Sequence, residues 1–128
     1  KILEPGVTVT AFDIPHGLGP DFCLHLMSVV SPVREDLAVV YEPLAPVRLL
    51  HELHTRGVEV LPLPEEDNLT LGCNVLAIRP GVAVIASGND ATVALLRDHG
   101  VEVHVYEASE ISKGEGGPTC LTRPLLRG

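Results

Sequence analysis

The residues best suited to chemistry are a cysteine near the end of the sequence and a histidine near its beginning. Cys120 follows a turn-forming stretch, residues 114–118, which holds three glycines and one proline. Glycine tolerates positive φ and lets a ligand approach the backbone, and proline fixes the turn, so this stretch presents a thiol. A thiolate is a strong nucleophile, and an imidazole such as that of His25 can both donate and accept a proton. Taken alone, Cys120 also fits a buried packing thiol, and His25 also fits a core or surface residue.

Two other kinds of site find little support in the sequence. Cys23, His25 and Cys120 lack the tight ligand pairs that zinc sites normally have. The glycine-rich stretch 114–117 is not followed by a helix whose N-terminus would bind a phosphate. We therefore expect no metal, no cofactor and no nucleotide.

The composition limits the class of protein and its partners. A chain of 128 residues with 45% hydrophobic residues fits one folded domain, and with only 3% aromatics its core must be built from small aliphatic side chains. A net charge of −8 argues against nucleic-acid binding and suits a cationic substrate. Three cysteines, an odd number without a CxxC spacing, indicate a reducing compartment, and we expect a cytoplasmic protein. No apolar run has the length of about 20 residues that a membrane span needs.

The elements that must position these residues follow a repeated order. In the first half we expect strands at residues 7–12, 22–31, 37–41 and 58–63, with a helix from Pro46 to Arg56 that ends at Gly57. The strand at 22–31 would place Cys23, His25 and Met27 on one face. In the second half we expect strands at 74–78, 82–86 and 101–106, and a helix at 91–99 capped by Asn89 or Asp90.

The sequence also repeats where each helix ends. Residues 56–60 read Arg-Gly-Val-Glu-Val and residues 99–103 read His-Gly-Val-Glu-Val. We infer two copies of a strand-strand-helix-strand unit of roughly 40 to 45 residues, which is an α/β fold. We place the two units at residues 23–64 and 71–107.

Three stretches of the chain together resemble the guanidine-modifying enzymes, the pentein superfamily of arginine deiminases, dimethylarginine dimethylaminohydrolases and amidinotransferases. The resemblance is firmest at residues 24–31, 71–78 and 114–126. It implies a five-bladed α/β propeller of repeated ββαβ units around a central active site, of which this chain would be the C-terminal portion. The relatives' pattern makes Cys120 the nucleophile and His25 the general acid and base. It places Met27, Asn74 and Gly117 at substrate-binding positions.

The resemblance implies a hydrolase that cleaves a C–N bond of a guanidine or amidine substrate, of arginine or N-methylated arginine type. The covalent intermediate would be a thiouronium on Cys120. Amidino transfer at the same site and a non-catalytic half that needs a partner segment remain alternatives. Met27 stands where arginine deiminases have an acidic residue and dimethylarginine hydrolases a basic one, so the substrate clamp is altered.

The remaining partner predictions concern the rest of the polypeptide. The first residue is Lys1 rather than methionine, which indicates a fragment or a processed product. The carboxylates that hold the guanidinium in the family would then precede Lys1, and we expect a homo-oligomer or association with that N-terminal part. We also expect His25 and Cys120 to approach each other across a cleft.

Several other polar residues are interpreted as structural. Cys73 fits a packing thiol. His51 and His54 lie on the polar side of the first helix, where solvent exposure is expected. The acidic residues Glu65, Glu66 and Asp67 are expected to be solvated loop charges.

Overall fold

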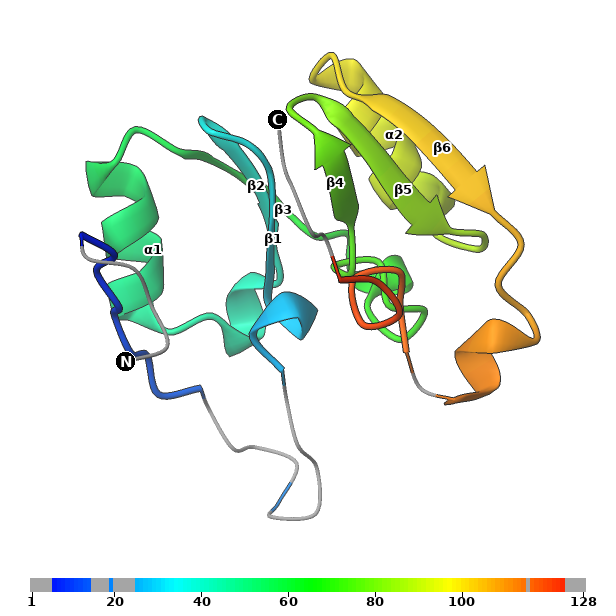
Figure 1. The fold of residues 1–128 in the computed structure, drawn as a ribbon, viewed down its shortest axis with the longest axis horizontal. Helices are drawn as coiled ribbons and strands as arrows, with labels where there is room; N and C mark the ends of the chain where they lie inside the picture. The colour runs from blue at the N-terminus through cyan, green and yellow to red at the C-terminus, as the bar shows by residue number, and fades with distance from the viewer. Residues whose placement is uncertain (1–5, 15–18, 20–24, 115, 124–128) are drawn as a thin grey trace.

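The computed structural model describes residues 6–14, 19, 25–114 and 116–123 (Figure 1). It contains two consecutive ββαβ units, in agreement with the sequence prediction. The first unit consists of β1 (Val30–Arg34), β2 (Leu37–Val40), α1 (Val47–Thr55) and β3 (Glu59–Pro62). The second consists of β4 (Leu76–Arg79), β5 (Val82–Ala86), α2 (Asp90–Asp98) and β6 (Glu102–Tyr106). Short 3-10 turns occupy Leu26–Ser28, Glu42–Leu44, Glu65–Asp67 and Ile111–Gly114.

Each unit forms its own three-stranded sheet with the same topology. The first two strands are antiparallel, and the helix then crosses over to a third strand that runs parallel to the second. Gly57 and Gly100 end the two helices with φ of +73° and +76°, a conformation that only glycine adopts without cost. The paired sequence repeat at these two positions therefore marks the same helix-to-strand junction in both units.

The central strand β2 forms at the continuous apolar run predicted as a strand at residues 37–41, and its burial explains that run. All of its residues are buried, and they alternate between two core clusters. Leu37 and Val39 join β5 and α2 in the larger core, whereas Ala38 and Val40 pack with Leu49 of α1. A strand covered on both faces needs apolar residues at every position. In Figure 1 the two sheets stand next to each other, with β1 and β4 as the neighbouring strands.

Of the two strands predicted near the N-terminus, one is wrong and the other is only partly confirmed. Residues 7–12 form no strand, since they pair with no other strand in the described part, and Val7 and Val9 are exposed. The prediction for 22–31 holds only from Val30 onward, and its residues 22–24 lie outside the described residues. The Ser28 and Val29 N–H groups donate to the carbonyls of His25 and Leu26 at 2.8 and 2.9 Å. Local turn bonds thus take the backbone groups that a strand would have used for pairing.

A buried serine joins the two units next to the start of β4. Ser31 of β1 has no exposed surface. Its Oγ donates to the Cys73 carbonyl at 2.5 Å and accepts from the Val75 N–H at 3.2 Å. The two bonds fix the residues on both sides of Asn74 against β1. The Asn74 N–H also donates to the Leu71 carbonyl within a turn. Because these bonds occupy the backbone groups before Leu76, the strand predicted at 74–78 begins only at Leu76.

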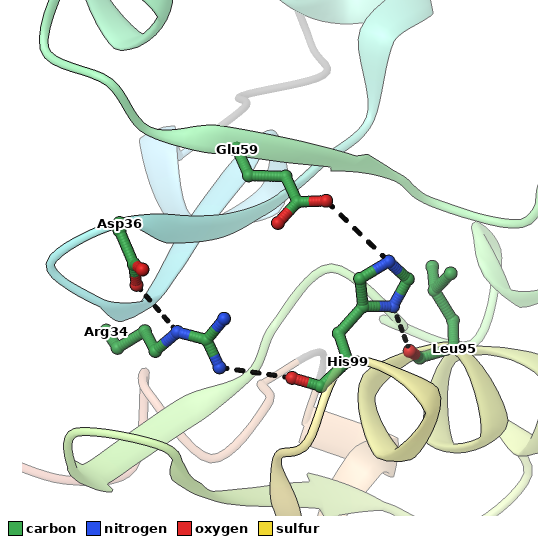
Figure 2. Close-up of polar contacts among 5 residues, drawn as sticks. All are labelled: Arg34, Asp36, Glu59, Leu95 and His99. Carbon is green, nitrogen blue, oxygen red and sulfur yellow. Dashed lines mark hydrogen bonds and ion pairs between the residues drawn. The ribbon is translucent and has the colours of Figure 1, made fainter.

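A second polar contact between the units lies at the helix end of α2 (Figure 2). Arg34 pairs with Asp36 at 2.6 Å and donates through Nη1 to the His99 carbonyl at 3.1 Å. The His99 ring donates from Nδ1 to the Leu95 carbonyl at 2.8 Å, and its Nε2 lies 3.8 Å from a Glu59 carboxylate oxygen. These contacts connect the β1–β2 turn and β3 to the end of α2. They hold the two units in one orientation.

The loop before β4 contains one residue whose predicted role is wrong. Asp67 is buried rather than solvated, whereas Glu65 and Glu66 are exposed as predicted. The Asp67 carboxylate accepts from the Thr92 N–H at 2.6 Å and from the Thr92 hydroxyl at 2.7 Å, so it satisfies a free donor in the first turn of α2. A Cβ on Gly72 would lie 2.7 Å from Asp67, so this loop requires a glycine there.

The predicted capping of α2 by its own N-terminal residues is also corrected. Asn89 occupies the N-cap position but makes no side-chain bond to a helix N–H. Its Nδ2 instead donates to the carbonyls of Thr70 and Ala86, both at 3.0 Å. Asn89 therefore fixes the preceding loop, and the cap is supplied from a distance by Asp67. In the described part of the chain, no helix is long and apolar enough to cross a membrane.

Asp67→Ala should lower the free energy of unfolding by about 2–3 kcal/mol, because it leaves the buried Thr92 N–H and hydroxyl without their charged acceptor. Urea denaturation measures the effect. Glu66→Ala is the matched control, since it removes an exposed carboxylate one residue away and should change stability by less than about 0.5 kcal/mol. Equal effects of the two substitutions would contradict the assigned cap.

Candidate active site around Cys120

Cys120 lies in a tight turn that leaves its thiol exposed. Gly116, Gly117 and Pro118 are buried, while Cys120 itself is exposed. The N–H groups of Cys120 and Leu121 both donate to the Gly117 carbonyl, at 3.1 and 3.2 Å. The buried glycines and proline anchor the turn, and Cys120, two residues after the proline, is exposed. The glycine-rich stretch thus presents a thiol, as the sequence predicts.

The Asn74 side chain joins this turn to the start of β4. Asn74 is only 2% exposed. Its Nδ2 donates to Cys120 Sγ at 3.2 Å, and its Oδ1 accepts from the Thr119 N–H at 3.0 Å and from the Thr119 hydroxyl at 2.6 Å. A Cβ on Gly117 would overlap the Asn74 side chain. Three of the predicted site residues, Asn74, Gly117 and Cys120, are therefore brought together.

The surroundings of Cys120 favour the thiolate. Partial burial is the largest single influence and raises the pKa of the thiol, but four hydrogen-bonding contributions oppose it. These come from the Gly117 backbone, the Asn74 amide, the Thr119 hydroxyl and the backbone of Cys120 itself. Together they bring the pKa of Cys120 below its ordinary value. Hydrogen bonds to the charged form produce this effect without a neighbouring cation.

Cys73 has the opposite character, which confirms that it is a packing thiol. It is buried, and burial raises its pKa to about 12, although a backbone hydrogen bond with Tyr41 acts the other way. Its sulfur donates weakly to the Val39 carbonyl at 3.7 Å. Cys23, the third cysteine, lies outside the described residues. Of the two described cysteines, only Cys120 combines exposure with a lowered pKa.

His25 and Met27 belong to the turn that precedes β1. His25 is exposed and stands directly before the 3-10 turn Leu26–Ser28, and Met27 is partly buried within that turn. Figure 1 places this turn and the segment 116–123 at the same end of the two sheets. Among the described residues, however, no hydrogen bond or ion pair joins His25 to Cys120. The approach of the two side chains therefore stays a prediction.

Two neighbours of Cys120 were missed in the sequence. Thr119 supplies two of the hydrogen bonds to Asn74, and its position next to the cysteine was the only available signal. Tyr106 ends β6, and its hydroxyl is buried without a hydrogen-bond partner in the described part. Burial first, and the charge of Cys120 second, raise the pKa of Tyr106. Nothing in the sequence pattern around Tyr106 indicated this proximity.

The described side chains contain no group of three or more His, Cys, Asp or Glu residues arranged to hold a metal ion. Among the described residues, Cys120 offers a nucleophilic thiol whose pKa is lowered. Asn74, which donates to this sulfur, is buried, whereas Cys120 itself is an exposed residue.

The chain is similar in fold to solved structures of an amidinotransferase and of an arginine dihydrolase. SxtG, an amidinotransferase from Microseira wollei, superposes with a TM-score of 0.66 and 16% identity, over 77% of this chain and 30% of that chain. The N-terminal domain of ArgZ, a cyanobacterial arginine dihydrolase, superposes with a TM-score of 0.69 and 18% identity, over 80% of this chain and 38% of that chain. These likenesses confirm the predicted fold, part of an α/β propeller of ββαβ units.

Sequence comparison identifies the family. The arginine deiminase of Bacillus cytotoxicus is 50% identical over 56 residues, which are 44% of this chain and 14% of that protein. The arginine deiminase of Clostridium perfringens is 42% identical over 71 residues, 56% of this chain and 17% of that protein. The chain thus spans less than a fifth of the length of these relatives. The family model for arginine deiminase matches residues 35–127, and the chain therefore belongs to the arginine deiminase family.

Proposed function

We propose that this protein hydrolyses a C–N bond of a guanidine or amidine substrate of arginine or N-methylated arginine type. The observation that carries the proposal is the exposed residue Cys120, whose sulfur contacts Asn74 and whose pKa is lowered, in a chain of the arginine deiminase family. A thiolate of this kind is a ready nucleophile for an electron-poor guanidinium carbon. The net charge of −8 suits a cationic substrate.

The proposed reaction has two steps, each with a balanced proton transfer. In the first, Cys120 Sγ bonds to the guanidinium carbon, the C–N bond breaks, and the departing amine takes a proton from the His25 imidazolium. In the second, His25 accepts a proton from water, whose oxygen attacks the same carbon. The C–S bond then breaks, the thiolate is restored, and the urea-type product loses the second proton of the water to the released amine or to solvent. One imidazole can serve both steps because it donates a proton in its charged form and accepts one in its neutral form.

Substrate recognition requires groups beyond the two catalytic residues. A guanidinium is held by carboxylates in bidentate geometry. The curated relatives extend far beyond the region matched by this chain, so other segments of the polypeptide can supply these carboxylates. Met27 brings an apolar thioether to the turn that follows His25, where a charged residue would otherwise act on the substrate. We expect that Met27, in place of a charged residue, makes the site less selective for a charged group on the substrate.

A second candidate function is amidino transfer at the same site. The likeness to the fold of an amidinotransferase favours it, and the chemistry differs only in the second step. An amine would then replace water as the nucleophile that attacks the thiouronium carbon. The family match to arginine deiminase makes hydrolysis the first choice. The two functions are separated by identifying the product formed in the presence of an added primary amine: a urea-type product indicates hydrolysis, and a new guanidine on the added amine indicates transfer.

Cys120→Ser should lower kcat for ammonia release from a guanidine substrate by at least about a thousandfold, because a hydroxyl without a strong base is a far weaker nucleophile than a thiolate. His25→Ala should lower it by about 10²–10⁴, the usual contribution of a general acid and base. The full-length protein is assayed, with Cys73→Ser as the control that removes a packing thiol. Undiminished turnover in Cys120→Ser would overturn the assignment, and absence of turnover in the native protein would favour the non-catalytic alternative.

Iodoacetamide should modify Cys120 in the folded protein and leave Cys73 unmodified. With a pKa of about 12, Cys73 has a thiolate fraction about three orders of magnitude below that of an ordinary thiol at neutral pH. The pKa of Cys120 is lowered, so its alkylation rate should remain high as the pH falls below the ordinary cysteine range and decline only when the thiolate is protonated. Peptide mapping by mass spectrometry across a pH series measures both rates. A Cys120 midpoint at or above about 8.5 would contradict the described environment.

A further inference from the structure

The orientation of the Asn74 amide is set by the residue next to Cys120. Its oxygen faces the backbone N–H of Thr119, at 3.0 Å, and a backbone N–H can only donate. A flipped amide would place its NH₂ group against that N–H, with two donors and no acceptor. The Thr119 backbone therefore determines that the NH₂ end of Asn74 lies toward Cys120 Sγ, at 3.2 Å.

The backbone of Asn74 is held as firmly as its side chain. The residues on either side of it, Cys73 and Val75, bond to the buried Ser31 hydroxyl of the other unit. The Asn74 N–H donates to the carbonyl of Leu71, which adopts a positive φ of 63°. An amide fixed at its backbone and at its oxygen has little freedom to move away from the sulfur. It is preorganised for one contact.

The same contacts leave Asn74 little capacity to bind a substrate. Its oxygen already accepts two hydrogen bonds from Thr119, and its NH₂ group faces Cys120. With 2% of its surface exposed, it offers no polar face to a ligand. The substrate-binding role expected for Asn74 is thus poorly supported by its contacts. The NH₂ group of Asn74 instead contacts the sulfur of Cys120, the proposed nucleophile.

Gly117 is the residue that permits this contact. A Cβ at position 117 would overlap the Cβ, Cγ and Oδ1 atoms of Asn74, so any other residue would push the turn and the amide apart. Gly117 is itself buried and accepts the backbone bonds of the Cys120 turn. The glycine thereby keeps the sulfur within hydrogen-bond distance of the amide.

We propose that Asn74 is a positioning residue that donates a hydrogen bond to the Cys120 sulfur, stabilises its thiolate and fixes its direction, with Gly117 maintaining the contact. The inference rests on the proposed function of Cys120 as the nucleophile and adds the group that prepares it. It assigns the activation of the sulfur in the free protein to an amide rather than to an adjacent imidazolium. His25 is then free to act on the leaving amine and on water.

The test is Asn74→Asp in the full-length protein, read by the pH dependence of Cys120 alkylation with iodoacetamide. Aspartate keeps the shape and the acceptor for Thr119, but it replaces the donor by a negatively charged oxygen. The alkylation midpoint should move upward by about one pH unit or more. With a guanidine substrate, kcat should fall about tenfold or more while KM changes little, because the residue acts through the sulfur rather than on bound substrate.

Two further variants keep the outcome interpretable. Asn68→Asp makes the same chemical change six residues earlier in the same loop, at a side chain without a hydrogen bond in the described part, and should leave the midpoint unchanged. Protection of Cys73 from alkylation reports that each variant is folded. If Asn74→Asp exposes Cys73, Asn74→Ala is used instead, and it should also move the midpoint upward.

An unchanged Cys120 midpoint in a folded Asn74 variant would overturn the inference. So would a midpoint shift of the same size in Asn68→Asp. The alkylation measurement needs no guanidine substrate, so it is independent of the proposed function. A shifted midpoint in a protein that turns over no guanidine would retain the role of Asn74 and reject the function.

Discussion

The site depends on one interaction between the two units, the pair of hydrogen bonds that Ser31 makes with the backbone on either side of Asn74. Ser31 belongs to β1 and is fully buried, so its hydroxyl needs protein partners, and both of them belong to the neighbouring unit. Because both bonds go to backbone groups, they position the main chain at residue 74. The side chain of Asn74 then reaches the Cys120 turn, which lies 46 residues further along the chain. Three distant segments are connected through this one asparagine.

The two described cysteines illustrate how environment decides the chemistry of one residue type. Cys73 lies one residue from Asn74 but faces the core, where burial raises its pKa to about 12. Cys120 is exposed and surrounded by hydrogen-bond donors that lower its pKa despite the opposing effect of burial. The fold therefore disfavours the thiolate of Cys73 and favours that of Cys120, and the contacts that do so come from uncharged groups among the described residues. Hydrogen bonds from protein groups to the Cys120 sulfur are the physical basis of the proposed nucleophile.

The elements that the sequence predicts correctly are those determined by local pattern. The continuous apolar run of β2 and the helix ends at Gly57 and Gly100 follow from burial and from glycine's access to positive φ. The Cys120 turn follows in the same way from its glycines and proline. The errors arise where partners are distant. The stretch 22–31 is apolar enough for a strand, yet local turn bonds form at Leu26–Ser28 instead. Asp67 caps a helix 25 positions away, which no local pattern could indicate.

The central claim is that Cys120 forms a covalent bond to the guanidinium carbon, and acid-quenched mass spectrometry tests it most directly. The full-length protein is mixed with a guanidine substrate labelled with ¹³C at that carbon, quenched with acid during turnover, digested and mapped. We expect the labelled amidino carbon on the Cys120 peptide, with greater accumulation in His25→Ala because water is no longer activated for the second step. Label on Cys23 or Cys73 instead, or turnover without label on any cysteine, would contradict the account.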